Sequence, residues 1–183
     1  MKRRMSLPLR ERAWFFAAYK HQGQLYPGTE LPYLVHIGMV LLELTQALQA
    51  EDSSALDADL AIGCALLHDT VEDTETTLDE LRLYFNDEIA AGVEALTKNP
   101  HLSKAASMSD SLQRLLQQPR EVQMVKLSDR IANLGVPPVY WSEEKCLAYA
   151  AEGQQILAAL EAASSFLAGR LGERIAAWQS MAF

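Results

Sequence analysis

Residues 61 to 73 read AIGCALLHDTVED, an apolar run that ends in four polar side chains. The run predicts a buried helix, which we place at residues 56 to 72. Within that helix His68 and Glu72 are four apart, as are Asp69 and Asp73, so all four side chains are expected on one arc. Carboxylates crowded on one face repel one another unless a cation lies between them. The stretch is therefore either a solvated helix end, where acids are common, or a site that holds a cation.

Apolar residues recur at helical spacing through the rest of the chain, and no Asn-Gly or Asp-Gly hairpin signal appears. We therefore expect an all-α fold, a single helical bundle over residues 1–183 with C-terminal helices in 143–181 packed on the rest. Thr77 followed by Glu80 predicts a capping box, and Ser142 predicts another helix start. The expected helices are 9–21, 36–50, 56–72, 77–84, 86–96, 103–117, 119–134, 143–162 and 164–181.

Composition limits the class of protein. A chain of 183 residues suits one domain, and Cys64 and Cys146 lie in apolar helical patterns without CxxC spacing, which is typical of reduced, buried thiols. The formal charge is -8 and no dense Lys/Arg run occurs, which argues against a nucleic-acid polymer as partner but not against a small phosphorylated ligand.

No apolar stretch is long enough to cross a bilayer, and residues 1–14 lack a signal-peptide core. We expect a cytoplasmic protein without a membrane partner; the sequence leaves homo-oligomerisation open.

Two more polar side chains occupy comparable places in other expected helices. His36 ends the stretch LPYLVH at the start of one apolar helix, and Asp129 lies inside another, in MVKLSDRIANL. A buried, unpaired carboxylate is costly, so Asp129 needs a partner. Lys126 or Arg130 would supply one as a local ion pair.

The alternative partner is a metal ion, on which His36, His68, Asp69 and Asp129 would converge from three helices. Taken alone, His68 would more often be a core or capping histidine. Together, two imidazoles and two carboxylates form a mixed N/O donor set that suits Mn²⁺, Fe²⁺ or Zn²⁺ better than Ca²⁺. Open coordination positions would remain for water or substrate. Such an ion activates water, and one of the two acids that follow the His-Asp doublet would handle protons beside it.

The order His, His-Asp, Asp on a helical chain resembles the HD superfamily of metal-dependent phosphohydrolases. Five ordered blocks over roughly residues 10 to 135 are similar to the hydrolase domain of RelA/SpoT-type proteins, whose single-domain members are the small alarmone hydrolases. These blocks are HQGQ (21–24), LPYLVH (31–36), ALLHDTVEDTETT (65–77), ALTK (95–98) and VKLSDRIANL (125–134).

The resemblance implies an activity and roles for individual residues. The reaction would be hydrolysis of the 3′-pyrophosphate of guanosine 3′,5′-bispyrophosphate (ppGpp), with water activated by the metal attacking phosphorus in line. Glu72 and Asp73 would help to activate that water, and Asn133 would contact the substrate. The family's characteristic ion is Mn²⁺, and its ligand positions fall on His36, His68, Asp69 and Asp129.

The sequence departs from the family in the segment LYPGTEL, residues 25–31. Relatives usually carry an Arg-Lys-Ser-type segment there, whereas this chain has one extra residue and no cation. Tyr26 falls near the place of the arginine that packs on guanine, and a tyrosine ring can also stack on a base. Lys20 and His21, just before the segment, are candidate phosphate neighbours, although such residues at a helix end also simply complement its dipole. Residues 135–138, GVPP, replace a segment in which relatives carry a substrate-contacting threonine.

The first hypothesis is therefore a metal-dependent pyrophosphohydrolase of ppGpp or a close nucleotide relative. The second is an HD phosphohydrolase of another phosphorylated metabolite, which the altered segment favours. The third, from a different class, is a non-catalytic nucleotide-binding module. A degenerate module would be expected to have lost at least one ligand or water-activating acid, and none is missing here.

Overall fold

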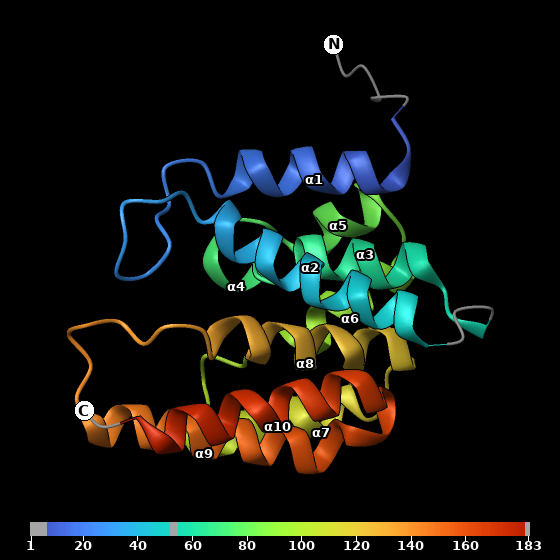
Figure 1. Ribbon diagram of the computed structural model, residues 1–183. Helices are drawn as coiled ribbons and strands as arrows, with labels where there is room; N and C mark the ends of the chain where they lie inside the picture. Colours follow the sequence, from blue (N-terminus) through green and yellow to red (C-terminus); the bar gives the residue numbers. More distant parts are fainter. Residues whose placement is uncertain (1–6, 52–54, 182–183) are drawn as a thin grey trace.

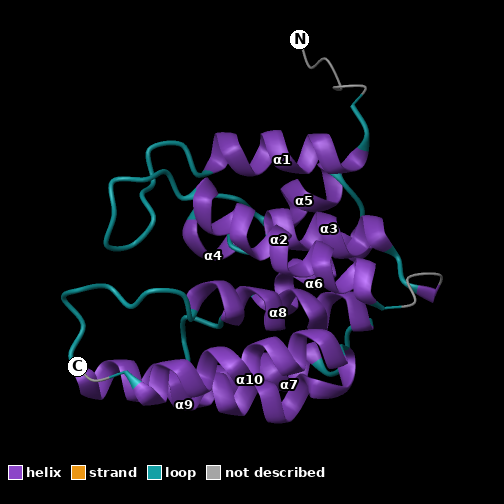
Figure 2. Ribbon diagram, in the orientation of Figure 1, coloured by secondary structure: helices purple, strands orange, loops and turns teal. Residues whose placement is uncertain are grey.

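The computed structural model describes residues 7–51 and 55–181, and the regular structure in these ranges is helical (Figure 1, Figure 2). An isolated bridge between Leu25 and Pro32 stands outside any strand. This confirms the expected all-α fold; residues 1–6, part of the basic N-terminal segment, lie outside the described ranges. The helices are α1 (Leu9–Lys20), α2 (Leu34–Ala50), α3 (Ala58–Leu67), α4 (Thr70–Asp73), α5 (Leu78–Tyr84), α6 (Asp87–Leu96), α7 (Lys104–Leu115), α8 (Arg120–Asn133), α9 (Glu143–Leu160), the short 3₁₀ helix η2 (Glu161–Ala163) and α10 (Ser165–Ser180).

Local capping explains where several of these helices begin. Thr77 accepts a hydrogen bond from the backbone N–H of Glu80, and Ser142 accepts one from that of Lys145, so both expected helix starts are confirmed. Only the Thr77 half of the expected capping box is found among the described residues, and the Glu80 carboxylate instead accepts a bond from Lys20 Nζ at 2.8 Å. That contact joins the end of α1 to the start of α5.

The expected continuous helix over 56–72 is wrong at its C-terminal end. α3 stops at Leu67 and α4 starts at Thr70. Side chains take over the carbonyls at the break: His68 Nδ1 donates to Ala65 O at 2.8 Å, and Thr70 Oγ1 donates to Leu67 O at 2.7 Å. Such local bonds compete with the backbone ladder of a helix. The four polar side chains therefore surround a junction and do not lie on one arc.

α3 is the central element of the bundle. Every residue of α3 from Leu60 to Leu67 is buried, because α1, α2, α6 and α8 pack around it. In Figure 1, α1 lies on one side of α3, and α9 and α10 lie on the opposite side of the bundle, beneath α8. Trp178 of α10 donates from Nε1 to the carbonyls of Leu134 and Gly135, which ties α10 to the end of α8. None of the helices within the described ranges combines the length and hydropathy needed to cross a membrane.

Two long loops, residues 21–33 and 134–142, lie on the same side of the bundle, at the left in Figure 1 and in teal in Figure 2. They approach each other closely, since a Cβ built on Gly28 would come within 3.3 Å of Pro138 Cβ and 3.6 Å of the Tyr140 ring. Gly28 also has a φ of 80°, which favours glycine. A side chain at this position would therefore disturb both loops.

The close packing of α6 between α3 and α8 gives a stability prediction. A Cβ at Gly92 would lie 2.6 Å from Cys64 Sγ and 3.0 Å from Val122 Cγ2 in the core. We expect Gly92→Ala to lower the free energy of unfolding by about 1–3 kcal/mol through overpacking. Gly169 on α10 is the matched control, because a Cβ there meets nothing within 4 Å. Gly169→Ala should stabilise by about 0.5–1 kcal/mol through helix propensity. Urea denaturation measures both, and a neutral Gly92→Ala would contradict the packing argument.

Candidate metal centre

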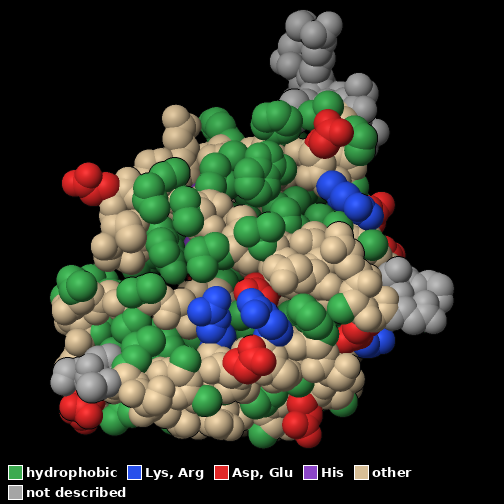
Figure 3. Space-filling view, in the orientation of Figure 1, with side chains coloured by type: hydrophobic (Ala, Val, Ile, Leu, Met, Phe, Trp, Pro, Cys, Tyr) green, Lys and Arg blue, Asp and Glu red, His purple; other side chains and the backbone are tan. Residues whose placement is uncertain are grey.

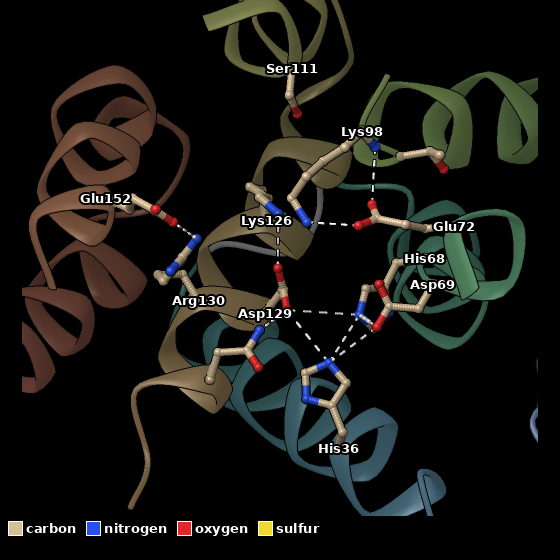
Figure 4. A network of polar contacts seen from close by, with 12 residues as sticks. His36, His68, Asp69, Glu72, Lys98, Ser111, Lys126, Asp129, Arg130 and Glu152 are labelled. Atoms are coloured by element: carbon tan, nitrogen blue, oxygen red, sulfur yellow. Dashed lines mark hydrogen bonds and ion pairs between the residues drawn. The ribbon is translucent and has the colours of Figure 1, made fainter. Parts of the chain in front are cut away.

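Four polar side chains from three parts of the chain meet in the interior (Figure 4). His36 points in from α2, His68 and Asp69 come from the junction of α3 and α4, and Asp129 comes from α8. His36 Nε2 lies 3.2 Å from His68 Nε2 and 3.3 Å from Asp69 Oδ2. His68 Nε2 lies 2.9 Å from the same Asp69 oxygen. The structure thus brings the four predicted metal ligands together.

Asp129 reaches the cluster from the opposite side. Its Oδ1 lies 3.5 Å from His36 Nε2 and 3.9 Å from His68 Nε2. The tighter set, with all ligand atoms within 4.8 Å of one another, consists of His36, His68 and Asp69. Asp129 is therefore the outermost of the four candidate ligands.

Further hydrogen bonds orient the side chains of the candidate ligands. The bond from His68 Nδ1 to Ala65 O fixes the tautomer in which Nδ1 carries the proton. The lone pair of Nε2 can then bind a metal ion, an arrangement common for metal-binding histidines. Lys126 Nζ donates to Asp129 Oδ2 at 2.9 Å, and Asn133 Nδ2 donates to Asp129 Oδ1 at 2.5 Å. The ion-pair explanation of Asp129 and the metal explanation are therefore compatible, because Lys126 takes the oxygen that faces away from the histidines.

Arg130, the other candidate partner of Asp129, points elsewhere. Its guanidinium lies 4.2 Å from the centroid of the Tyr149 ring, and Nη2 is 3.6 Å from Glu152 Oε2 on α9. Figure 4 shows it directed away from the His-Asp cluster. Arg130 joins α8 to α9 and does not neutralise Asp129.

Electrostatics at the cluster favour a cation. Burial would raise the pKa of Asp69, but the charge of His68 and hydrogen bonds from both histidines hold it well below its usual range. Burial would also raise the pKa of Asp129, but the charge of Lys126 and a hydrogen bond from His36 lower it below its usual range. Burial would lower the pKa of His36, yet hydrogen bonds to Asp129 and Asp69 raise it to about 9. Two ionised carboxylates and two imidazole nitrogens thus face one point, and this buried donor set fits a divalent metal ion.

Glu72 and Asp73, which the sequence treats alike, have different surroundings. Glu72 accepts hydrogen bonds from both the backbone N–H of Lys98, at 3.0 Å, and its Nζ, at 2.7 Å. Asp73 forms no ion pair with a Lys or Arg among the described residues; burial raises its pKa, and the charges of Asp69 and Glu72 raise it further. Asp73 is thus the acid better suited to exchanging protons, and Glu72 is occupied by Lys98.

A pocket of about 130 Å³ adjoins the cluster. Its wall combines three of the candidate ligands, both acids, Asn133 and two lysines. The lining residues are Tyr33, His68, Asp69, Glu72, Asp73, Leu96, Lys98, Lys126, Asp129 and Asn133.

The remaining predicted substrate contacts divide into two groups. Asn133 lines the pocket, and the Tyr26 ring lies nearly parallel to that of His36 with centroids 6.1 Å apart. Lys20 instead bonds to Glu80, and His21 is buried, with its ring stacked on Tyr33 and Nδ1 2.6 Å from Gln24 Oε1. Neither Lys20 nor His21 lines the pocket.

Sequence reasoning missed three residues of the site. Lys98 had no visible link to Glu72, which lies 26 residues earlier. Lys126 was considered only as an ion-pair partner, although it also lines the pocket. Tyr33 lies in the quoted stretch LPYLVH, three residues before His36, and that proximity was the available signal.

Comparisons with known proteins agree with this geometry. The family model described as HD domain matches residues 13–172. Guanosine-3′,5′-bis(diphosphate) 3′-pyrophosphohydrolase MESH1 of Mus musculus is 34% identical over 151 residues, which cover 80% of this chain and 81% of that protein. MESH1 of Xenopus tropicalis is 32% identical over 161 residues, covering 85% and 87%. A longer pyrophosphohydrolase of the same description from Aquifex aeolicus is 34% identical over 154 residues, but only 20% of that protein is covered.

A solved structure shows the same fold. It belongs to a metazoan orthologue of SpoT that hydrolyses ppGpp, and it matches with a TM-score of 0.80 at 22% identity, covering 94% of this chain and 97% of that one. The family resemblance inferred from the five sequence blocks is thereby confirmed. The chain belongs to the HD-domain family, in the group that includes the MESH1-type pyrophosphohydrolases.

Proposed function

We propose that this chain is a metal-dependent hydrolase that removes the 3′-pyrophosphate of ppGpp or of a closely related nucleotide. The observation that carries the proposal is a His-His-Asp cluster with buried histidines that adjoins a pocket lined by two further acids and two lysines. The MESH1-type relatives named for this reaction support the choice of substrate. The proposed enzyme is a single domain over residues 1–183 that works in the cytoplasm on a small nucleotide, with no nucleic-acid polymer and no membrane as partner.

The proposed cofactor is Mn²⁺, with Fe²⁺ or Zn²⁺ as the other ions that suit two nitrogen and two oxygen donors. The residues that would hold it are His36, His68, Asp69 and Asp129. When bound, a divalent ion lowers the pKa of water and offsets charge on phosphoryl oxygens.

Asp73 is the proposed general base and Glu72 a positioning residue. Asp73 lines the pocket without a Lys or Arg partner among the described residues, and its raised pKa brings it closer to neutral pH, where a base works best. Glu72 holds Lys98 with two hydrogen bonds, so that the ammonium group stays at the pocket wall. Lys98 and Lys126 are the cations that line this pocket, and they would bind phosphate oxygens of the substrate.

The nucleoside end of the substrate would lie toward the two loops. Residues 22–33 and 134–142 contain no Lys or Arg, and Figure 3 shows hydrophobic side chains along this side of the molecule. Tyr26 is the proposed base-stacking residue, because its ring already lies over His36 beside the cluster. The absence of Lys and Arg from these loop residues also supports a second candidate function, an HD phosphohydrolase of a different phosphorylated nucleotide.

A nucleotide panel tests the proposed reaction. Metal-free protein is reloaded with Mn²⁺ and incubated with ppGpp and other phosphorylated nucleotides, and products are separated by ion-exchange chromatography. We expect GDP and pyrophosphate from ppGpp, and only the EDTA background rate from Asp69→Asn. Turnover of another nucleotide with ppGpp untouched would select the second candidate. No turnover of any nucleotide would favour the non-catalytic binding module.

Metal binding should stabilise the fold. A ligand that binds only the native state adds about 2.7 kcal/mol at about 100 times its Kd, so Mn²⁺ should raise the melting temperature of EDTA-treated protein. Asp69→Asn should lose most of this increase. Asp110→Asn is the control, because Asp110 pairs with Arg114 on α7. An equal increase in the Asp69 variant would show that Mn²⁺ binds elsewhere.

The two acids should respond differently to substitution. Asp73→Asn should lower kcat by about 10²–10⁴-fold, as for loss of a general base, with little change in KM. Because the ionised form is required, wild-type kcat should fall as pH drops through the raised pKa of Asp73, and the variant should lack that dependence. Glu72→Gln frees Lys98 and should mainly raise KM. Equal loss of kcat in both variants at all pH values would contradict this division.

A further inference from the structure

Tyr33 lies at the centre of the site without being a predicted ligand or base. It is the residue just before α2, and its backbone N–H donates to Gln24 O at 2.9 Å, which closes the loop over residues 24–33. Its ring is 9% exposed and sits between two imidazoles, with centroids 4.8 Å from that of His21 and 5.3 Å from that of His36. The ring position is therefore set from both sides.

The hydroxyl of Tyr33 is aimed at Asp69. It donates to Asp69 Oδ2 at 2.6 Å, and this is the oxygen that faces both histidine Nε2 atoms. A short bond at that oxygen restricts rotation of the carboxylate about its terminal bond. Tyr33 thus determines which way the metal-facing oxygen of Asp69 points.

A second contact extends the influence of Tyr33. His36 Nδ1 is buried and has no hydrogen-bond partner within the described part of the chain, so ring contacts hold this imidazole, whereas a backbone carbonyl holds that of His68. Tyr33 therefore contacts two candidate ligands, Asp69 through its hydroxyl and His36 through its ring.

We propose that Tyr33 is a positioning residue that orients Asp69 toward the metal ion through its hydroxyl and holds His36 through its ring. The inference rests on the proposed metal site and deepens it. Tyr33 acts through these residues and needs no contact with substrate. Removing such a supporting hydrogen bond typically costs about 10–100-fold in metal affinity or activity.

The test is Tyr33→Phe, which keeps the ring between the histidines and removes only the hydroxyl. Mn²⁺ binding is measured without nucleotide from the electron paramagnetic resonance signal of free Mn²⁺. We expect the Kd for Mn²⁺ to rise about 10–100-fold. At saturating Mn²⁺, kcat should recover toward the wild-type value, because the lost hydrogen bond acts on metal binding, and KM should be unchanged. Circular dichroism of the EDTA-treated proteins verifies that the fold is retained.

Tyr84→Phe is the matched control, because this tyrosine on α5 packs its ring against Phe16, away from the site. It should bind Mn²⁺ as the wild type does. An unchanged Mn²⁺ Kd in Tyr33→Phe, or an equal rise in Tyr84→Phe, would overturn the proposal. The binding measurement uses no nucleotide, so it gives its answer even if ppGpp proves not to be the substrate. If ppGpp is not hydrolysed, a raised Kd for Mn²⁺ in Tyr33→Phe still supports the positioning role of Tyr33.

Discussion

Asp69 and Asp129 place two ionised carboxylates inside a helical bundle, where an unpaired charge is costly. The surrounding side chains offset that cost: Lys126 bonds to one oxygen of Asp129, and Tyr33 bonds to Asp69. The two histidines face Asp69 Oδ2, the oxygen that Tyr33 also contacts, and Asp129 Oδ1. Hydrogen bonds to these carboxylates raise the pKa of His36 to about 9. Positive charge is thus drawn to this point even before an ion is considered. A divalent cation would supply it without requiring a proton on the nitrogens that are to bind it.

The apolar helices make that arrangement rigid. α3 is buried from Leu60 to its end at Leu67, so the position at which it ends is fixed by packing on several sides. The helix breaks there because His68 and Thr70 bond to its last carbonyls, and the break turns both members of the His-Asp doublet toward α2 and α8. A continuous helix would have directed successive side chains about 100° apart around its axis. The break therefore lets neighbouring residues serve one site.

The sequence was most informative where the physical signal is local or strongly periodic. Apolar spacing placed the helices of the described chain, and Thr77 and Ser142 marked two of their starts. The break after Leu67 was missed because it depends on side-chain bonds that compete with an otherwise favourable helix. The pairing of Lys98 with Glu72 was missed because it is non-local. Lys20 and Glu80 form a similar pair between α1 and α5, which keeps that lysine from the pocket.

In the proposed enzyme, different groups would recognise the phosphates and the nucleoside. Lys98 and Lys126 line the pocket from the helical side, whereas the loops at its edge carry no cation and expose Val136 and Val139 by 89% and 99%. A surface that binds mainly through apolar contact rejects a related ligand weakly, whereas paired polar groups reject it strongly. On the proposed function, the position of the phosphates should therefore decide the substrate more than the identity of the base. In the proposed enzyme, a loop with Tyr26 and no Lys or Arg would therefore discriminate weakly between bases, and Lys98 and Lys126 would select for the pyrophosphate.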